Sequence, residues 1–204
     1  MSTEVPWLYL ASQSPRRRQL LEQWGLRCEL LLPDPHEDAE GLELVRPNEA
    51  PATYVRRVTR LKLEHAVARL QRRGLPAGPV LCADTTVALG RQILGKPESP
   101  DHAVQILRQL SGRKHQVLTA VALHHQGRMH QALSRSTVQF SALSEAQIAH
   151  YVASGEPMGK AGAYGIQGLA GLLIARISGS HTGIMGLPAF ETAQLLAEAG
   201  LPIT

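Results

Sequence analysis

Short apolar runs of strand length alternate along this chain with segments of helical periodicity, and this alternation restricts the fold more than any other feature. The apolar runs span residues 7–11, 28–32, 79–89, 116–124, 129–140 and 172–177. The helical patterns span residues 15–24, 52–73, 101–110, 145–153 and 188–199. Strands that alternate with helices predict an α/β domain. Gly127, between two of the apolar runs, predicts a hairpin, so the sheet should be mixed.

Turn and cap signals mark several element ends. Ser144 followed by Gln147 has the spacing of a capping box, so a helix should begin directly after Ser144. Gly25 follows a helical pattern and is typical of a residue that ends a helix. Residues 33–51 are polar, acidic and rich in proline, which predicts a long loop. Long ordered loops are often functional.

The length of 204 residues suits one domain, residues 1–204, whose core needs no disulfide. Cys28 and Cys82 lie in apolar runs and predict buried, reduced thiols. Residues 1–6 lack the basic start of a signal peptide, and no apolar run approaches the roughly 18 residues needed to cross a membrane. We therefore expect a cytoplasmic protein.

The chain carries a mild basic excess, with a net charge of +4 and a pI near 9.4. This charge suits an anionic partner, either a small phosphate compound or a nucleic acid. Sites for single-stranded nucleic acid interleave basic and aromatic side chains, and this chain is only 4% aromatic. A small phosphate ligand is therefore the favoured partner, with neither nucleic acid nor membrane expected.

A polar cluster follows the first apolar run, with Ser12, Ser14, Arg16 and Arg17 at the turn into a helical pattern. The start of a helix offers free backbone N–H groups that suit phosphate. An arginine adds a planar fork that can hold a phosphate through two hydrogen bonds. Alternatively, Ser14 only caps the helix and the arginines are solvated. The grouping of all four residues favours phosphate binding.

Two acidic positions predict a site for a divalent cation. Asp84 ends the apolar run that begins at Val80, where a carboxylate needs a metal, a cation or hydrogen bonds to compensate its charge. Glu37 lies in the acidic loop, where it is either solvated or a second oxygen ligand. Mg²⁺ and Mn²⁺ prefer such oxygen ligands, and Mg²⁺ usually takes one or two carboxylates from the protein.

Three further residues are candidates of a weaker kind. Lys96 follows Asp84 across a predicted hairpin and could face the same phosphates, or be an ordinary turn lysine. Lys62 lies on the longest helical pattern and either faces phosphates or is solvated. Gln167, in a glycine-rich segment, has an amide that can donate to and accept from the edge of a base. It could equally be an exposed turn residue.

Together these motifs resemble the Maf family of nucleotide pyrophosphatases over almost the whole chain. The resemblance is carried by Ser12 to Arg17, Ala83-Asp84-Thr85, Gly95-Lys96-Pro97, Leu110-Ser111-Gly112, residues 160–171 and Gly186-Leu187-Pro188. It implies an elongated, two-lobed single domain similar to inosine triphosphate pyrophosphatases, with a twisted mixed sheet, flanking helices and a central cleft. It also implies a homodimer.

The resemblance is strongest to the branch that acts on dTTP and UTP. That branch has an arginine, a threonine and a glutamine that match Arg17, Thr85 and Gln167, the positions linked with base choice. The resemblance makes Asp84 the residue that accepts a proton from water and places Lys96 near the phosphates. Glu37 and Lys62 match further active-site positions. The early loop departs from the family pattern, so Asp38 is an alternative to Glu37.

These observations predict an enzyme that cleaves a nucleoside triphosphate to the monophosphate and pyrophosphate. Mg²⁺ or Mn²⁺, bound by Glu37 and Asp84, would assist water attack on the α-phosphorus, with Asp84 acting as general base or as metal ligand. The substrate could be a canonical or a modified pyrimidine nucleotide, in a house-cleaning or cell-division-arrest role. The alternative is a non-catalytic regulator of cell division that only senses nucleotides.

Overall fold

The computed structural model describes residues 7–38, 41–201 and 203 of the chain. The acidic, proline-containing start at residues 1–6, which supported the absence of a signal peptide, lies outside this range. Within the described ranges, no helix combines the length and the apolar character that a membrane crossing requires.

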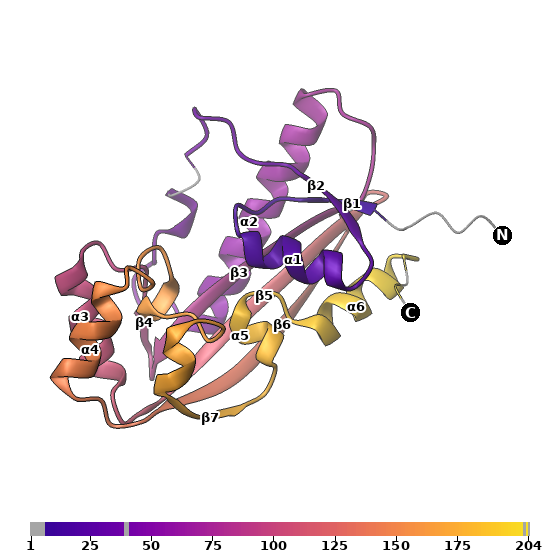
Figure 1. The fold of residues 1–204 in the computed structure, drawn as a ribbon. Helices are drawn as coiled ribbons and strands as arrows, with labels where there is room; N and C mark the ends of the chain where they lie inside the picture. Colours follow the sequence, from indigo (N-terminus) through magenta and orange to yellow (C-terminus); the bar gives the residue numbers. More distant parts are fainter. Residues whose placement is uncertain (1–6, 39–40, 202, 204) are drawn as a thin grey trace.

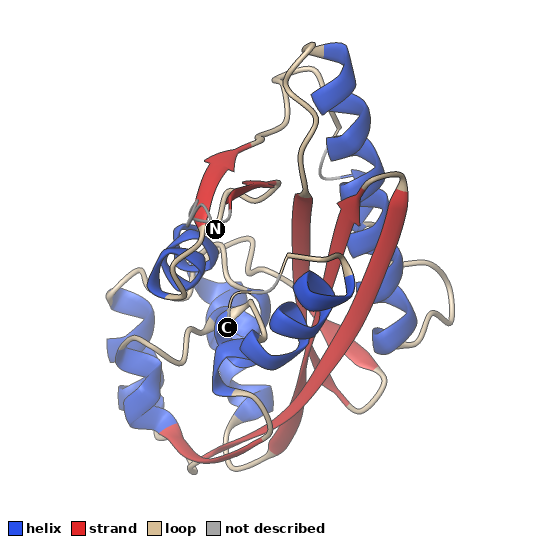
Figure 2. Ribbon diagram, turned by 90° about the vertical axis from the view of Figure 1, so that its right-hand side faces the viewer, coloured by secondary structure: helices blue, strands red, loops and turns tan. Residues whose placement is uncertain are grey.

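A seven-stranded mixed sheet runs through the molecule, as the sequence predicts (Figure 1). Its strands are β1 (Trp7–Leu10), β2 (Arg27–Leu30), β3 (Val80–Leu89), β4 (Gln92–Leu94), β5 (Lys114–His125), β6 (Arg128–Phe140) and β7 (Ile174–Ser178). The strand order is β2-β1-β3-β5-β6-β7, and β4 pairs with β3. β1 is parallel to β2 and β3, whereas the other pairs are antiparallel. Figure 2 shows the long hairpin strands twisting along the molecule.

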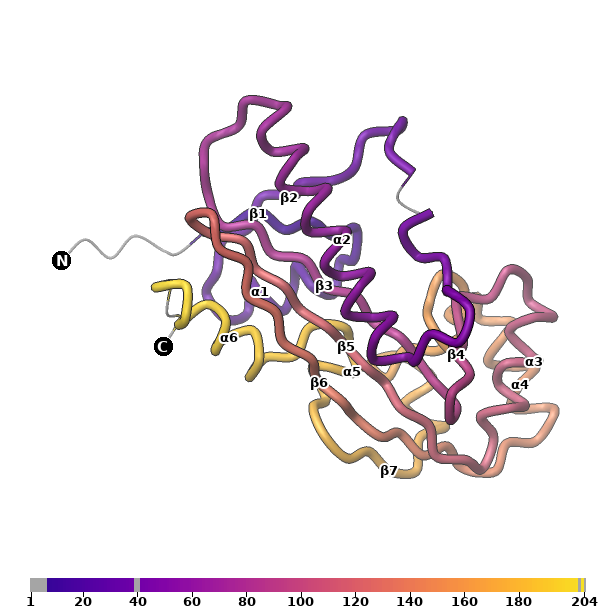
Figure 3. The backbone as a smooth tube through the Cα atoms, turned by 180° about the vertical axis from the view of Figure 1, so that it is seen from behind, coloured from indigo at the N-terminus to yellow at the C-terminus, as the bar shows by residue number. Residues whose placement is uncertain are grey.

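Helices flank this sheet. They are α1 (Pro15–Gln23), α2 (Pro51–Arg72), α3 (Pro100–Leu110), α4 (Glu145–Ala153), α5 (His181–Met185) and α6 (Ala189–Glu198). The long helix α2 covers one face, seen in front in Figure 3, and α1, α5 and α6 lie on the other face (Figure 1). α3 and α4 pack together at one end of the sheet.

Most predicted element ends agree with the structure to within about two residues. Ser144 forms the expected capping box: its hydroxyl accepts from the Gln147 backbone N–H, while the Gln147 side chain accepts from the Ser144 N–H. The sequence pattern did not predict the short helix His181–Met185. Its single turn is too short to show helical periodicity, although Ser180 caps it by accepting from the Gly183 N–H.

Strand β3 forms the wall of an opening in the sheet. Along one edge it pairs with β5 from Val80 to Ala88. Along its other edge, β1 pairs only with Val80 and Leu81, and β4 pairs only with residues 87–89. Residues 82–86 therefore lie on a stretch of edge between two short neighbouring strands. This break in an otherwise continuous sheet provides space for a cleft.

The position of Asp84 corrects one expectation. Because Asp84 follows the apolar residues Val80–Cys82, the sequence predicts a carboxylate at the end of a strand, but Asp84 lies in the middle of β3, opposite Ala120 of β5. Successive strand residues point to opposite faces of a sheet, so Asp84 and Thr85 face different layers. Asp84 contacts Lys62 of α2, and Thr85 contacts Arg17 of α1.

An aromatic cluster fills the core at the end of the sheet that α3 and α4 cover. The rings of His115, Phe140 and Tyr164 meet edge to face, with centroids 4.9–5.4 Å apart. His115 is 2% exposed, and its Nε2 shares a 2.8 Å hydrogen bond with the Tyr164 hydroxyl. The Nδ1 atom has no hydrogen-bond partner among the described residues. Burial lowers the pKa of His115 from 6.5 to about 4.

This buried histidine should make stability depend on pH. Unfolded His115 binds a proton below pH 6.5, whereas the folded side chain does so only near pH 4. The unfolded state therefore binds more protons between these values, and stability falls as the pH is lowered through them, by on the order of 3 kcal/mol. Urea unfolding at several pH values gives the free energy of unfolding as a function of pH. The slope of this free energy against pH should be shallower for His115→Gln than for wild type. His150→Gln, at an exposed position of α4, is the control; equal slopes for both variants would contradict the prediction.

Candidate active site

One cavity of about 890 Å³ opens beside β3 and contains every residue that the sequence nominated. Those that line it are Ser12, Ser14, Arg16, Arg17, Glu37, Lys62, Asp84, Thr85, Lys96 and Gln167. They come from segments far apart in the chain. The prediction that these motifs meet at one cleft is therefore confirmed, although their chemical roles do not follow from proximity alone.

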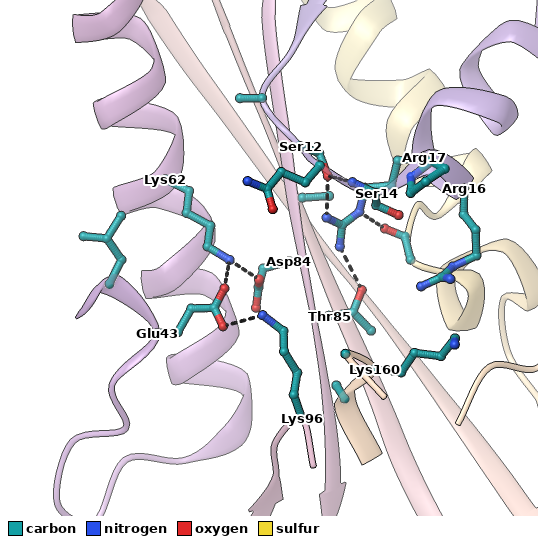
Figure 4. A pocket seen from close by; sticks show the side chains of 18 of the residues that line it. Ser12, Ser14, Arg16, Arg17, Glu43, Lys62, Asp84, Thr85, Lys96 and Lys160 are labelled. Carbon is teal, nitrogen blue, oxygen red and sulfur yellow. Dashed lines mark hydrogen bonds and ion pairs between the residues drawn. The ribbon is translucent and has the colours of Figure 1, made fainter. Parts of the chain in front are cut away.

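A chain of alternating charges forms the α2 side of the cavity (Figure 4). The Lys62 Nζ donates to Asp84 Oδ1 and to Glu43 Oε1, each at 2.6 Å. Glu43 Oε2 accepts from Lys96 Nζ at 3.0 Å. Lys62 is thus held between two carboxylates, and it orients both of them along the cavity wall.

The protonation of this chain follows from its contacts. Burial by itself lowers the pKa of Lys62, but the carboxylates of Asp84 and Glu43 outweigh burial and the pKa lies above its ordinary value. Burial raises the pKa of Glu43, but Lys62 and then Lys96 bring it below its ordinary value. At neutral pH the site therefore presents a protonated Lys62 beside an ionised Glu43.

The other side of the cavity is organised by Arg17. Its guanidinium donates to Gly186 O at 2.7 Å, Ser12 Oγ at 2.9 Å and Thr85 Oγ1 at 3.3 Å. Thr85 Oγ1 is in turn 3.0 Å from Thr119 Oγ1. This network connects the first turn of α1 to β3 and to the end of α5, so that Arg17 has a defined orientation.

Ser14, Arg16 and Lys160 complete the basic side. Ser14 occupies the N-cap position of α1, but its side chain makes no capping hydrogen bond, which removes the purely structural explanation for this serine. Burial, and then the nearby charge of Arg16, lowers the pKa of Lys160. Two like charges that face one another across a cavity favour an anion between them. Lys160 was not among the site residues predicted from the sequence.

Glu37 lines the cavity but serves a different set of contacts from those expected. Its carboxylate accepts from Arg69 Nη2 at 2.5 Å and from Arg72 Nη2 at 2.9 Å. The hydrogen bond from Arg69 lowers the pKa of Glu37 to about 2. The alternative residue, Asp38, accepts from the backbone N–H of Gly41. Both acidic side chains thus fasten the 33–38 segment.

Glu43 lies beside Asp84, where the sequence predicts Glu37. It ends the short 3-10 helix Gly41–Glu43, which rests against α2 through the hydrogen bond from Tyr54 Oη to Glu43 O. The loop at 33–51 contains several acidic residues with no periodicity to distinguish them. No local signal identifies Glu43, because its role depends on which loop acid reaches Lys62.

The donor set suits a hard divalent cation only in part. Among the described residues, no group of three or more His, Cys, Asp or Glu side chains could hold a metal ion. Asp84 and Glu43 nevertheless contact the same ammonium group and line one cavity. Mg²⁺ commonly takes one or two carboxylates from the protein and further oxygens from substrate phosphates. The two residues fit a metal that arrives with a phosphate ligand.

Comparison with known proteins agrees with this arrangement. The model of the Maf-like protein family matches residues 7–199. The chain belongs to the Maf family. A protein named dTTP/UTP pyrophosphatase from Albidiferax ferrireducens is 61% identical over 197 residues, which cover 97% of this chain and 98% of that protein. A protein of the same name from a Polaromonas species is 59% identical over the same shares of the two chains.

Membership in the Maf family accounts for the motifs that meet in the cavity. The family match spans the turn at residues 12–17, β3, the Gly95-Lys96-Pro97 turn and the segment that carries Gln167. The backbone joins the last two, since the Gly162 N–H donates to Gly95 O at 3.0 Å. The Maf motifs are therefore parts of a single contiguous site.

Replacing Arg17 by lysine should destabilise the fold. A lysine cannot reproduce a planar fork that donates to three partners, so groups around Gly186, Ser12 and Thr85 lose hydrogen bonds. We expect Arg17→Lys to cost about 2 kcal/mol, measured by urea unfolding.

The control is Arg18→Lys, on the same helix. The Arg18 side chain is exposed and forms an i,i+4 ion pair with Glu22 at 2.7 Å. That variant should stay within about 0.5 kcal/mol of wild type. An Arg17→Lys protein as stable as Arg18→Lys would show that the three contacts do not hold the site together.

Proposed function

We propose that this chain hydrolyses dTTP and UTP to the monophosphate and pyrophosphate. One observation carries the proposal: a carboxylate oriented by a partly buried lysine, Asp84 with Lys62, lies in one cavity with the cations Arg16, Arg17, Lys96 and Lys160. Relatives at 61% and 59% identity, matched over almost their whole length, are named dTTP/UTP pyrophosphatases.

The cations in this cavity bind the triphosphate. Ser14, the backbone N–H groups at the start of α1 and Arg16 offer donors on one side, and Lys96 offers a mobile ammonium group on the other. Lys96 is about half exposed and its present partner is Glu43, so a phosphate oxygen can replace that carboxylate. Phosphoryl transfer depends mainly on such positioning and electrostatic stabilisation.

Asp84 receives the proton when water attacks the α-phosphorus. The new bond joins the water oxygen to phosphorus, the bond to the bridging oxygen breaks, and pyrophosphate leaves with the bonding electron pair. Lys62 holds Asp84 by its Oδ1 atom, so the carboxylate keeps a fixed direction towards the cavity. The positive charges of Lys96 and Arg16 stabilise the negative charge that develops on the leaving group.

A divalent cation, Mg²⁺ or Mn²⁺, fits the α2 side of the cavity, where Asp84 and Glu43 lie. Asp84 and Glu43 would hold it together with phosphate oxygens, and when bound it would neutralise charge and polarise the α-phosphate. Glu37, the ligand expected from the sequence, is engaged by Arg69 and Arg72. We therefore propose Glu43 in its place.

The base is recognised where Gln167 lines the cavity, because the Gln167 amide can donate to and accept from a pyrimidine edge. Arg17 and Thr85, the other two positions linked with base choice, line the same cavity and are joined by a 3.3 Å hydrogen bond. A site built to hydrogen-bond one base edge rejects bases that leave its polar groups unpaired. Modified pyrimidine nucleotides that keep this edge remain substrates under the proposal.

Asp84→Asn should abolish most turnover. An amide of the same shape neither accepts the proton nor supplies a full negative charge to a metal, so kcat should fall about 10²- to 10⁴-fold. The measurement is pyrophosphate release from dTTP. Asp101→Asn, in the first turn of α3, makes the same change away from the cavity and should retain wild-type turnover. A turnover close to wild type in Asp84→Asn would remove the proposed mechanism.

A panel of nucleotides tests the substrate class and the metal together. Purified protein should release pyrophosphate from dTTP and UTP faster than from ATP or GTP. Chelation with EDTA should suppress release, and added Mg²⁺ or Mn²⁺ should restore it. Preference for a purine triphosphate would refute the choice of base. Nucleotide binding without any pyrophosphate would favour a sensing regulator of cell division over an enzyme.

We further propose that the protein acts in the cytoplasm as a homodimer. The thiols of Cys28 and Cys82 are free, which suits a reducing compartment. The proposal of a homodimer rests on the resemblance to the Maf family alone. Sedimentation of the purified protein measures the oligomeric state directly.

A further inference from the structure

The segment that carries Gln167 has little regular structure of its own. Residues 155–171 contain the 3-10 turn Ala161–Ala163 and the start of a second at Leu169. Gln167 itself is exposed, as are its neighbours Gly168 and Leu169. A side chain on such a loop recognises a base only if other contacts hold the loop in place.

Glu156 supplies such contacts from the start of the segment. Its Oε2 accepts from the Leu169 backbone N–H at 2.8 Å, and its Oε1 accepts from the Ala170 N–H at 3.4 Å. The carboxylate thus closes the segment from Glu156 to Leu169, two residues after Gln167. Hydrogen bonds to an ionised acceptor are stronger than those between neutral groups, so a single side chain can hold both amides.

The Glu156 carboxylate also contacts a residue of the core. Glu156 Oε1 accepts from the Tyr151 hydroxyl at 2.9 Å, and Tyr151 is 2% exposed on α4. Tyr151 packs in the cluster that includes Phe140 and Ile148. The carboxylate therefore connects an irregular turn to a helix that packs in the core.

The glycines around Gln167 show how closely the turn is packed. A Cβ atom at Gly168 would lie 2.2 Å from Glu156 Oε2, and one at Gly165 would lie 3.1 Å from Gln167 Nε2. The Gly168 N–H also donates to Gly165 O at 3.0 Å. The Gln167 amide thus folds over a turn whose far side rests on Glu156.

We propose that Glu156 is a positioning residue for base recognition, which aims the Gln167 amide by fixing the turn on which it stands. The inference rests on the proposed function, because it assumes that Gln167 reads the base. The Glu156 carboxylate accepts from Tyr151, Leu169 and Ala170, whereas Lys160 Nζ donates to the Glu156 backbone carbonyl, which a substitution of the side chain leaves in place. Loss of the carboxylate should therefore affect base choice and leave the phosphate half of the site intact.

The test compares selectivity in Glu156→Ala and Glu156→Gln. For each protein, kcat/KM is measured with dTTP and with GTP, and inhibition by inorganic tripolyphosphate reports the phosphate half alone. Glu156→Ala should lower kcat/KM for dTTP about 10- to 100-fold, since small misplacements of a positioning group have effects of that size. The ratio of dTTP to GTP should fall about tenfold. Inhibition by tripolyphosphate should stay within about twofold of wild type.

The conservative variant separates positioning from general stability. Glu156→Gln keeps one oxygen that can accept from the Leu169 N–H, so it should recover part of the dTTP selectivity. Tyr151→Phe removes one of the three contacts and should also give an intermediate ratio, which keeps the test informative if Glu156→Ala does not fold. Glu145→Ala is the matched control, because Glu145 lies on α4 and contacts exposed Arg108.

Equal losses of kcat/KM for dTTP and GTP, with an unchanged ratio in folded variants, would overturn the positioning role. So would a tripolyphosphate inhibition constant that weakens in parallel with dTTP turnover. If wild type releases no pyrophosphate from dTTP or UTP, the proposed function itself is wrong. If wild type is active and selective and the variants keep its selectivity, only this inference is wrong.

Discussion

The ion pair between Lys62 and Asp84 is the interaction on which the site depends. A carboxylate in the middle of a strand that is otherwise buried needs a compensating charge, and the nearest helix supplies it at 2.6 Å. Lys62 also contacts Glu43, which in turn contacts Lys96. One partly buried ammonium group thereby orients two carboxylates and, through Glu43, a second lysine, and the long helix α2 becomes a wall of the cavity.

The sheet provides the space in which these charges meet. Because β1 and β4 each pair with only a few residues of β3, the stretch between them has a free edge while β5 supports the other edge. Alternation along β3 sends Asp84 towards α2 and Thr85 towards α1. A single strand thus contributes one residue to the acidic wall and the next to the arginine network.

Two parts of the cavity are held by different means. One part is held by elements of the sheet and by the first turn of α1, with Arg17 joining three segments. The glycine-rich turn that carries Gln167 is held by the carboxylate of Glu156, and Tyr164 at its start shares a hydrogen bond with buried His115. If the turn reads the base as proposed, it can change without disturbing the charged residues around Asp84.

The sequence by itself, through its periodicity, determined the mixed α/β fold, the hairpin and the capping box. Its short motifs also named the predicted residues that line the cavity. These features are local, since apolar spacing and cap residues act within a few positions of one another. Tertiary structure alone decided which loop acid stands beside Asp84, that Lys62 and Lys160 face the cavity, and that Asp84 lies within a strand. Glu37 and Glu43 are equivalent as loop carboxylates in the sequence; only the folded chain places one against Arg69 and the other against Lys62.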